Sequence, residues 1–144
     1  MNLTNSLGTL VAAAAFVSPL IAPLGITAEA HVGAIGSVEA GEMEKQPPRW
    51  ANDACKEMRC RDPTAAEAMV EIVESHRMSL NSIGSRVDVL VSNIPQGVGE
   101  PWFDGLEPAL GRAYLSIPAA RAVAFGRGFD AARMTGIEHN NPWG

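Results

Sequence analysis

Apolar and polar residues alternate along two stretches of the chain, the pattern of a strand with one buried face. Residues 26–32 place Ile26, Ala28, Ala30 and Val32 opposite polar neighbours. Residues 87–91 carry valine at every second position and form the clearest strand pattern in the sequence. A shorter apolar run, Val123–Phe125, is a third strand candidate.

Helical patterns separate these strands. Asp62–Glu67 is typical of a helix start, because an Asp can cap, a Pro fits the first turn, and a Thr three residues before a Glu has capping-box spacing. This helix is predicted to reach about His76, with an apolar stripe through Met69. Asp104–Glu107 is a second cap-like start, followed by apolar positions to Tyr114. The alternation of helices and strands predicts an α+β layered domain.

The first thirty residues admit two interpretations. An apolar run over Leu10–Phe16 and the small-x-small sequence Ala28–Ala30 suggest a secretory signal peptide. However, no Lys or Arg precedes Lys45, and two prolines interrupt the segment before it reaches the ~18 apolar residues of a membrane helix. The alternative, which we favour, is a buried helix over Thr9–Val17 that leads into the strand at residues 26–32.

Composition narrows the classes of partner. The chain has 144 residues, enough for one modest domain with a core, and a net charge of −5. This charge argues against nucleic acid, which selects basic surfaces. Among 11 cationic residues only Lys45 and Lys56 are lysine. The excess of Arg over Lys suits bidentate phosphate or carboxylate contacts. A general bias in amino-acid composition is an alternative explanation of this excess. Residues 41–58 contain Pro47-Pro48 and are predicted to be a loop.

The residue types that carry chemistry form no known catalytic pattern. Cys55 and Cys60 lack further ligands at zinc spacing, so we expect reduced thiols and no metal site. His31, His76 and His139 stand at no catalytic or metal-binding spacing, and each is predicted to have a structural or surface role. These patterns alone predict a globular α+β piece and no particular reaction.

A series of short motifs is far more specific, and it resembles the chorismate synthase family. The family's sequences R-C-P-D-P, D-S-[IV]-G, V-P-x-G-L-G-E-P-x-F-D-x-L, S-I-[NP]-A, I-G-D-G-F and L-R-G-S-E-H-N are similar to Arg59–Pro63, Asn81–Gly84, Ile94–Leu106, Ser116–Ala119, Phe125–Phe129 and Met134–Asn140. They follow the family's order and spacing across residues 59–140. Upstream, Val11–Ala15 is similar to the family's V-A-A-G-A helix.

The resemblance implies a fold and a reaction. Chorismate synthases are β-α-β sandwiches, with helices between two antiparallel sheets, and assemble as homotetramers. They are lyases of the shikimate pathway of aromatic amino-acid biosynthesis, and eliminate phosphate from 5-enolpyruvylshikimate 3-phosphate to give chorismate. They require reduced FMN, and NADPH only in bifunctional reductase types. The resemblance thus implies a cytoplasmic flavoprotein enzyme with no nucleic-acid or membrane partner.

When the family's functional residues are carried over by position, only two of them have a counterpart in this sequence. The family's flavin site uses the third and fourth positions of S-I-[NP]-A, which are Pro118 and Ala119 here. Neither side chain is polar, so the resemblance implies backbone contact with the flavin; a turn after the preceding helix is a compatible interpretation. No catalytic residue transfers, because the S-H-G and P-G-H-A-D motifs with the family's histidines are absent, as is the flavin-binding R-S-S-A-R-E-T-A segment expected before Val11.

Residues 1–144 are therefore interpreted as a single incomplete chorismate synthase domain, with its best match at 59–140 and a loop at 41–58. We expect a truncated form that is inactive on its own. One alternative is a non-catalytic fragment or interaction module that complements a second polypeptide. The other, less favoured, is an exported small protein whose mature chain starts at His31.

Overall fold

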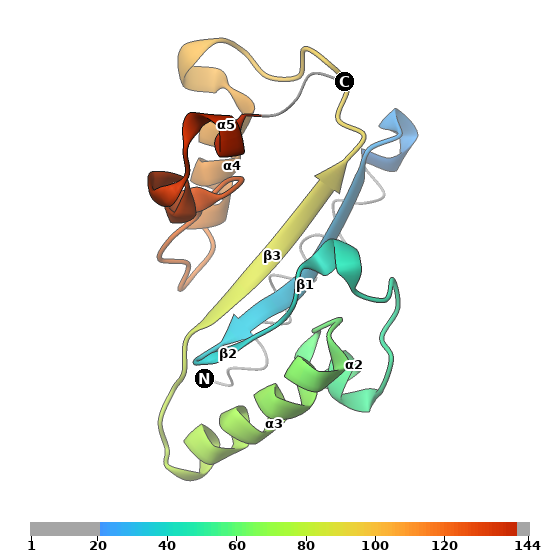
Figure 1. Cartoon of the computed structure of the whole chain (residues 1–144), viewed down its shortest axis with the longest axis vertical. Helices are drawn as coiled ribbons and strands as arrows, with labels where there is room; N and C mark the ends of the chain where they lie inside the picture. Colours follow the sequence, from blue (N-terminus) through green and yellow to red (C-terminus); the bar gives the residue numbers. More distant parts are fainter. Residues whose placement is uncertain (1–20, 141–144) are drawn as a thin grey trace. The chain divides into compact units, whose positions relative to one another are not determined.

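The computed structural model describes residues 21–140, and the chain divides into two compact units between Pro95 and Gln96. Figure 1 shows a sheet with its helices in the first unit and short helices in the second. The helix predicted over Thr9–Val17 and the apolar run Leu10–Phe16 lie outside the described residues. That both units belong to one incomplete domain stays a prediction. None of the described helices has the length and apolar character needed to cross a membrane.

The first unit contains a three-stranded antiparallel sheet in the order β2-β1-β3. Its strands are β1 (Thr27–Ile35), β2 (Val38–Glu39) and β3 (Ser85–Ser92), so the strands predicted at 26–32 and 87–91 are confirmed. β1 and β2 form a hairpin that pairs Ile35 with Val38. The φ of +57° at Gly36 is the conformation that the first position of a tight II′ hairpin turn requires.

A bulge at Gly33 changes which side chains of β1 face the core. The register of β1 against β3 shifts between Val32 and Ala34. A bulged residue reverses the alternation of side chains, so Val32 and Ile35 both join the core although their spacing is odd. β1 is continuously buried from Ala30 to Ile35. The sequence prediction of one buried and one exposed face was therefore wrong for this half of the strand.

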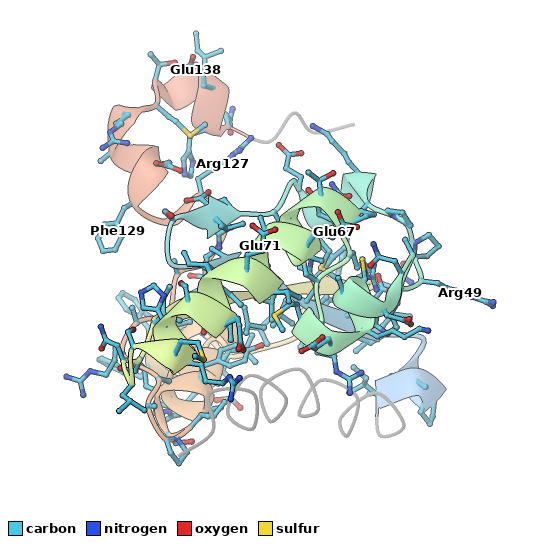
Figure 2. The ribbon with its side chains drawn as sticks, turned by 90° about the horizontal axis from the view of Figure 1, so that it is seen from below. Arg49, Glu67, Glu71, Arg127, Phe129 and Glu138 are labelled. Carbon is cyan, nitrogen blue, oxygen red and sulfur yellow. The ribbon has the colours of Figure 1, made fainter. Side chains whose placement is uncertain are left out.

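Two helices supply the rest of the core. They are α2 (Asp53–Met58) and α3 (Pro63–Met78), which contact each other, and α3 also contacts the sheet. Buried side chains from both helices, from the segment between them and from β1 form one cluster, which contains Val32, Ile35, Cys55, Met58, Cys60, Ala65, Ala66 and Met69. Burying a side chain as large as Ile35 or Met69 contributes about 1.5–3 kcal/mol. The outer face of α3 carries Glu67 and Glu71 (Figure 2).

The predicted loop over residues 41–58 is only partly a loop. It contains a 3-10 helix, η2 (Met43–Lys45), and all of α2. The helix α2 forms because the side chain of Asn52 accepts a hydrogen bond from Cys55 N–H, and it ends at Arg59 in the left-handed conformation. Six residues are too few for a helical period to be recognised in the sequence.

The start of α3 and its predicted cap at Asp62 are confirmed, but the predicted capping box from Thr64 to Glu67 does not form. Asp62 is the N-cap, and its Oδ1 accepts from Thr64 N–H and Ala65 N–H at 3.0 and 3.1 Å. Its Oδ2 accepts from Gly41 N–H at 3.0 Å, which ties the loop after β2 to the helix. Thr64 already lies inside the helix and caps nothing.

The second unit is helical in its described part. It contains η3 (Trp102–Asp104), α4 (Leu106–Leu115), η4 (Gly128–Arg133) and α5 (Gly136–His139). The predicted cap by Asp104 was wrong: Gly105 is the N-cap of α4 and gives no side-chain cap, while Asp104 accepts from Arg112. The strand predicted at Val123–Phe125 was also wrong, because no described strand pairs with this segment.

The helix α5 was missed from the sequence, which placed His139 in a loop. Thr135 and Glu138 form a capping box, in which Glu138 Oε2 accepts from Thr135 N–H at 2.7 Å. The spacing of a Thr three residues before a Glu was the available signal. No apolar stripe follows this spacing, so the sequence pattern alone does not indicate a helix there.

Candidate functional site

The two residues predicted to contact a flavin, Pro118 and Ala119, lie together in a tight turn. The helix α4 ends at Leu115, and Ala120 N–H then donates to Ile117 C=O at 3.1 Å. Pro118 occupies the second position of this turn, and Ala119 has a φ of +71° in the third. A proline followed by a left-handed residue is the arrangement of a type II turn. The predicted turn after the helix is confirmed.

This turn is formed by exposed residues. Pro118 and Ala119 are both exposed, and their side chains offer only carbon atoms. Among the described residues, none accepts a hydrogen bond from Ala119 N–H. An exposed peptide N–H held by a rigid turn can donate to a carbonyl or ring nitrogen of a flat ligand. The turn therefore fits a backbone contact with a flavin ring.

A phosphate group on such a ligand needs cations, which the turn itself lacks. Arg121 follows two residues after Ala119, is exposed, and has no acidic partner within the described part of the chain. Arg127 is also exposed and unpaired within residues 21–140. Arg112 and Arg133 of the same unit already pair with Asp104 and Asp130. The turn supplies part of a flavin phosphate site at most.

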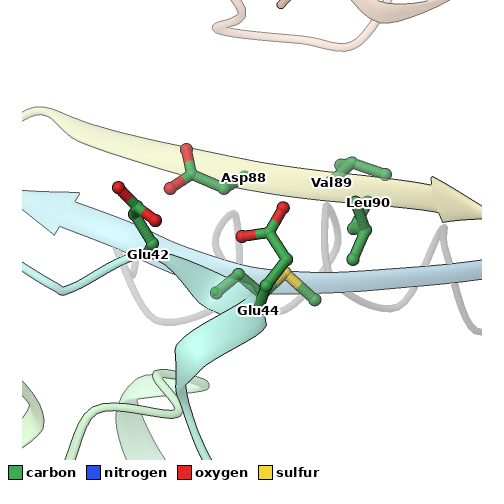
Figure 3. Close-up of a pocket in the computed structure, with 6 residues that line it drawn as sticks. Glu42, Glu44, Asp88, Val89 and Leu90 are labelled. Atoms are coloured by element: carbon green, nitrogen blue, oxygen red, sulfur yellow. The ribbon is translucent and has the colours of Figure 1, made fainter. Parts of the chain in front are cut away.

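A second candidate is a pocket of about 220 Å³ in the first unit. Its lining includes Glu42, Glu44 and Asp88, together with Met43, Val89 and Leu90 (Figure 3). Three carboxylates in one small pocket repel phosphates and carboxylates. Lys45 and Arg86 partly offset this charge through their ion pairs with Glu42 and Asp88. The pocket does not suit an anionic substrate.

Asp88, which lines this pocket, lies next to a buried histidine. His31 is fully buried in β1, and its Nδ1 accepts a hydrogen bond from Arg61 N–H at 3.4 Å. The ring proton is therefore placed on Nε2, which lies 3.7 Å from Asp88 Oδ2. His31, followed by Arg86, holds the pKa of the Asp88 carboxyl below its ordinary value.

The separation of 3.7 Å exceeds a hydrogen bond, so we treat the interaction as electrostatic. Within the described structure, His31 Nε2 has no hydrogen-bond partner. The predicted structural role of His31 fits this complete burial, since the ring cannot reach a bound molecule. The sequence pattern placed His31 on the polar, exposed side of its strand, and that placement was wrong.

The remaining chemistry-bearing residues stay apart from both candidates. His76 lies in the last turn of α3, with Nδ1 2.8 Å from Ile72 C=O. Cys55 and Cys60 are free thiols in the core. Within residues 21–140, no group of three or more His, Cys, Asp or Glu side chains is arranged to hold a metal ion.

Comparison with known proteins shows the family of this chain. A sequence model described as chorismate synthase matches residues 7–144. The chain belongs to the chorismate synthase family. It is 39% identical over 133 residues to a chorismate synthase of Roseiflexus castenholzii, and 38% identical over 135 residues to that of Aeropyrum pernix. Each match covers 92% of the chain and 36% of the relative, so the chain spans about a third of the length of these curated chorismate synthases.

A solved structure shares this fold. A crystal structure of a chorismate synthase superposes with a TM-score of 0.76, covering 99% of this chain and 46% of that one at 24% identity. The predicted α+β class and its chorismate synthase type are thereby confirmed. The described residues form one antiparallel sheet with its helices, which is part of the sandwich expected for a chorismate synthase.

Proposed function

We propose that this chain provides part of the flavin site of a cytoplasmic chorismate synthase. The complete assembly would eliminate phosphate from 5-enolpyruvylshikimate 3-phosphate to give chorismate, in aromatic amino-acid biosynthesis. The observation that carries the proposal is the exposed turn at Pro118 and Ala119, inside the segment that matches the family. The Ala119 N–H has no acceptor among the described residues, so the turn can offer it to a ligand without committing any side chain.

In this proposal, the backbone of the turn orients the flavin. Pro118 fixes its own φ, and the hydrogen bond from Ala120 N–H to Ile117 C=O closes the turn, so the backbone conformation is set before a ligand arrives. Arg121 is the nearest unpaired cation in the sequence and would approach an anionic part of the ligand. Reduced FMN, when bound, supplies an electron-rich ring that handles transient charge next to the substrate. NADPH would be needed only to reduce the flavin.

Neither His31 nor His76 is placed for proton transfer to a bound substrate. The ring of His31 is fully buried, and that of His76 is held at Ile72 C=O. The acidic pocket repels the anionic substrate. We therefore propose that the isolated chain is inactive, and that activity requires the remaining parts of the enzyme in a homotetramer of the family type. A non-catalytic interaction module is the second candidate, favoured by the exposed apolar side chains of the second unit.

Flavin binding tests this function. The purified chain is titrated with FMN reduced by dithionite, with and without 5-enolpyruvylshikimate 3-phosphate. Quenching of the tryptophan fluorescence of the chain is recorded. We expect the Kd to rise about tenfold in Ala119→Val, because a β-branched residue disfavours a positive φ. Ala109→Val, at an exposed position of α4, is the matched control. Equal binding by both variants would contradict the role of the turn.

A further inference from the structure

The two cysteines of the chain lie at the two ends of one turn that closes α2. Cys55 belongs to the helix, Cys60 follows it, and Arg59 between them has a φ of +54°. Arg59 N–H and Cys60 N–H both donate to Cys55 C=O, the second at 3.2 Å. A hydrogen bond from the sixth residue to the first, with a left-handed residue between them, is the Schellman arrangement. This arrangement commonly brings the side chains of its first and last residues into contact.

Both thiols lie in the interior of the first unit. Each cysteine is fully buried, and both belong to the same cluster of core side chains. The pKa of the Cys60 thiol is raised to about 11, mainly by burial and in part by Cys55. The influence of one thiol on the other requires that the two groups lie close together. Cys60 Sγ also donates weakly to Asp62 C=O at 3.7 Å.

These observations meet the two geometric conditions for a disulfide. The Cα atoms must lie within about 7 Å of each other, and the side chains must point to the same place. The hydrogen bond between Cys60 N–H and Cys55 C=O brings the two backbones together. Their shared cluster shows that both side chains point into the same part of the core. The thiols are reduced in this structure.

We propose that Cys55 and Cys60 are a reversible modification site, where an intramolecular disulfide forms on exposure to a low-molecular-weight disulfide. One cysteine thiolate attacks a sulfur of the oxidant, forms a mixed disulfide and releases one thiolate. The other cysteine thiolate attacks the protein sulfur of the mixed disulfide and releases the second. The two protein thiols lose two electrons and two protons, and the oxidant takes them up to become two thiols.

The disulfide would cross-link the place where three elements meet. Arg59 C=O accepts a hydrogen bond from Val32 N–H of β1 at 2.8 Å, and Asp62 caps α3. A bond from Cys55 to Cys60 joins the end of α2 to this segment, at the cost of the weak contact of Cys60 with Asp62. The site goes beyond the proposed function, because no residue of the flavin turn takes part in it. In a reducing compartment such a bond is transient and reports oxidation.

Access to the thiols limits how fast the bond forms. A buried thiol with a raised pKa reacts slowly, since the thiolate is the nucleophile. Oxidation therefore proceeds while the last turn of α2 is open, and α2 is only six residues long. Asn52 accepts the hydrogen bond that caps this helix. Asn52→Ala should accelerate oxidation several-fold, because it opens the helix more often. An unchanged rate in this variant would contradict oxidation through the opening of α2.

Equilibrium with glutathione tests the site. The purified 144-residue chain is kept in mixtures of reduced and oxidised glutathione, with and without concentrated urea, and free thiols are then alkylated. Because the chain has two cysteines, the disulfide form is the monomer whose intact mass shows neither an alkyl group nor glutathione. We expect its formation constant to be at least about tenfold larger in the folded chain than in urea. Equal constants, a persistent glutathione adduct or a disulfide-linked dimer would overturn the proposal.

Two substitutions at one exposed position test the role of the turn. The side chain of Arg59 is exposed, so replacing it acts mainly through the backbone. Arg59→Gly accepts the positive φ and should keep the formation constant. Arg59→Val disfavours this φ and should lower the constant about tenfold, because the cysteines are no longer held together. The same constant in both variants would show that the turn does not position the thiols, and would overturn the proposal.

Discussion

His31 Nε2 lies 3.7 Å from Asp88 Oδ2, across the pairing of β1 with β3. The ring is fully buried and the carboxylate is partly exposed, so Asp88 connects the interior of the first unit with its acidic pocket. Arg86 holds the carboxylate from the other side at 2.8 Å. The carboxylate lies directly over Gly33, the bulged residue of β1.

Asp88→Ala should lower the free energy of unfolding by about 0.5–3 kcal/mol, because it removes the carboxylate that faces the buried His31 ring and its ion pair with Arg86. Urea denaturation measures the change. Asp53→Ala is the control, since its side chain is 98% exposed and pairs only with Lys56. The control should change stability by less than about 0.5 kcal/mol. Similar losses in the two variants would show that His31 gains nothing from Asp88.

Gly33→Ala should destabilise the fold by about 1–3 kcal/mol, because a Cβ at this position would overlap the Asp88 carboxylate. Gly84→Ala is the matched control, as no atom lies within 4 Å of its added Cβ. The cost at Gly33 should shrink in an Asp88→Ala background, which removes the overlapping group. A double-mutant cycle on urea midpoints measures this coupling, and strict additivity would contradict the close approach.

Asp62→Ala should cost about 1–2 kcal/mol, because Thr64 N–H and Ala65 N–H lose their cap and Gly41 N–H loses its acceptor. Thr64→Ala, at the position whose spacing to Glu67 predicted a capping box, should cost little. Thermal unfolding followed by circular dichroism compares the two variants. A larger loss of stability in Thr64→Ala than in Asp62→Ala would support the capping box instead of the Asp62 cap.

The pH dependence of the same cap follows from its pKa. Hydrogen bonds from Gly41, Ala65 and Thr64 hold the pKa of the Asp62 carboxyl below its ordinary value. The unfolded chain therefore binds this proton more readily, and the stabilisation is present at neutral pH and is lost as pH falls below about 4. Asp62→Ala should flatten the acid side of the stability profile. An unchanged acid slope would contradict the cap.

The buried thiol of Cys60 should lower the free energy of unfolding at high pH. Burial raises the pKa of its thiol to about 11, above the ordinary value of 9.0 that the unfolded chain recovers. The stabilisation is complete below pH 9 and is lost as pH rises towards 11, by at most about 3 kcal/mol. Urea midpoints between these pH values, compared with Cys60→Ala, measure the effect. Parallel profiles would show that the thiol ionises equally in both states.

Local patterns were sufficient for the longer elements. Valine alternation predicted β3, and an Asp-Pro start with an apolar stripe predicted α3, because each pattern repeats over enough residues to be recognised. The motifs over residues 59–140 indicated the chorismate synthase family and pointed to the turn at Pro118 and Ala119. These features depend on residues that are close together in the sequence, so the sequence alone is enough to predict them.

Other features depended on residues that are distant in sequence. The burial of His31 follows from Arg61 and Asp88, and the side chains of β1 face as they do because the bulge at Gly33 reverses their alternation. Val123–Phe125 has the composition of a strand but no described strand beside it, and a strand exists only through its partner. The sequence by itself determined the longer local elements and the family, whereas only the tertiary structure decided which side chains are buried, because burial is a property of what packs against them.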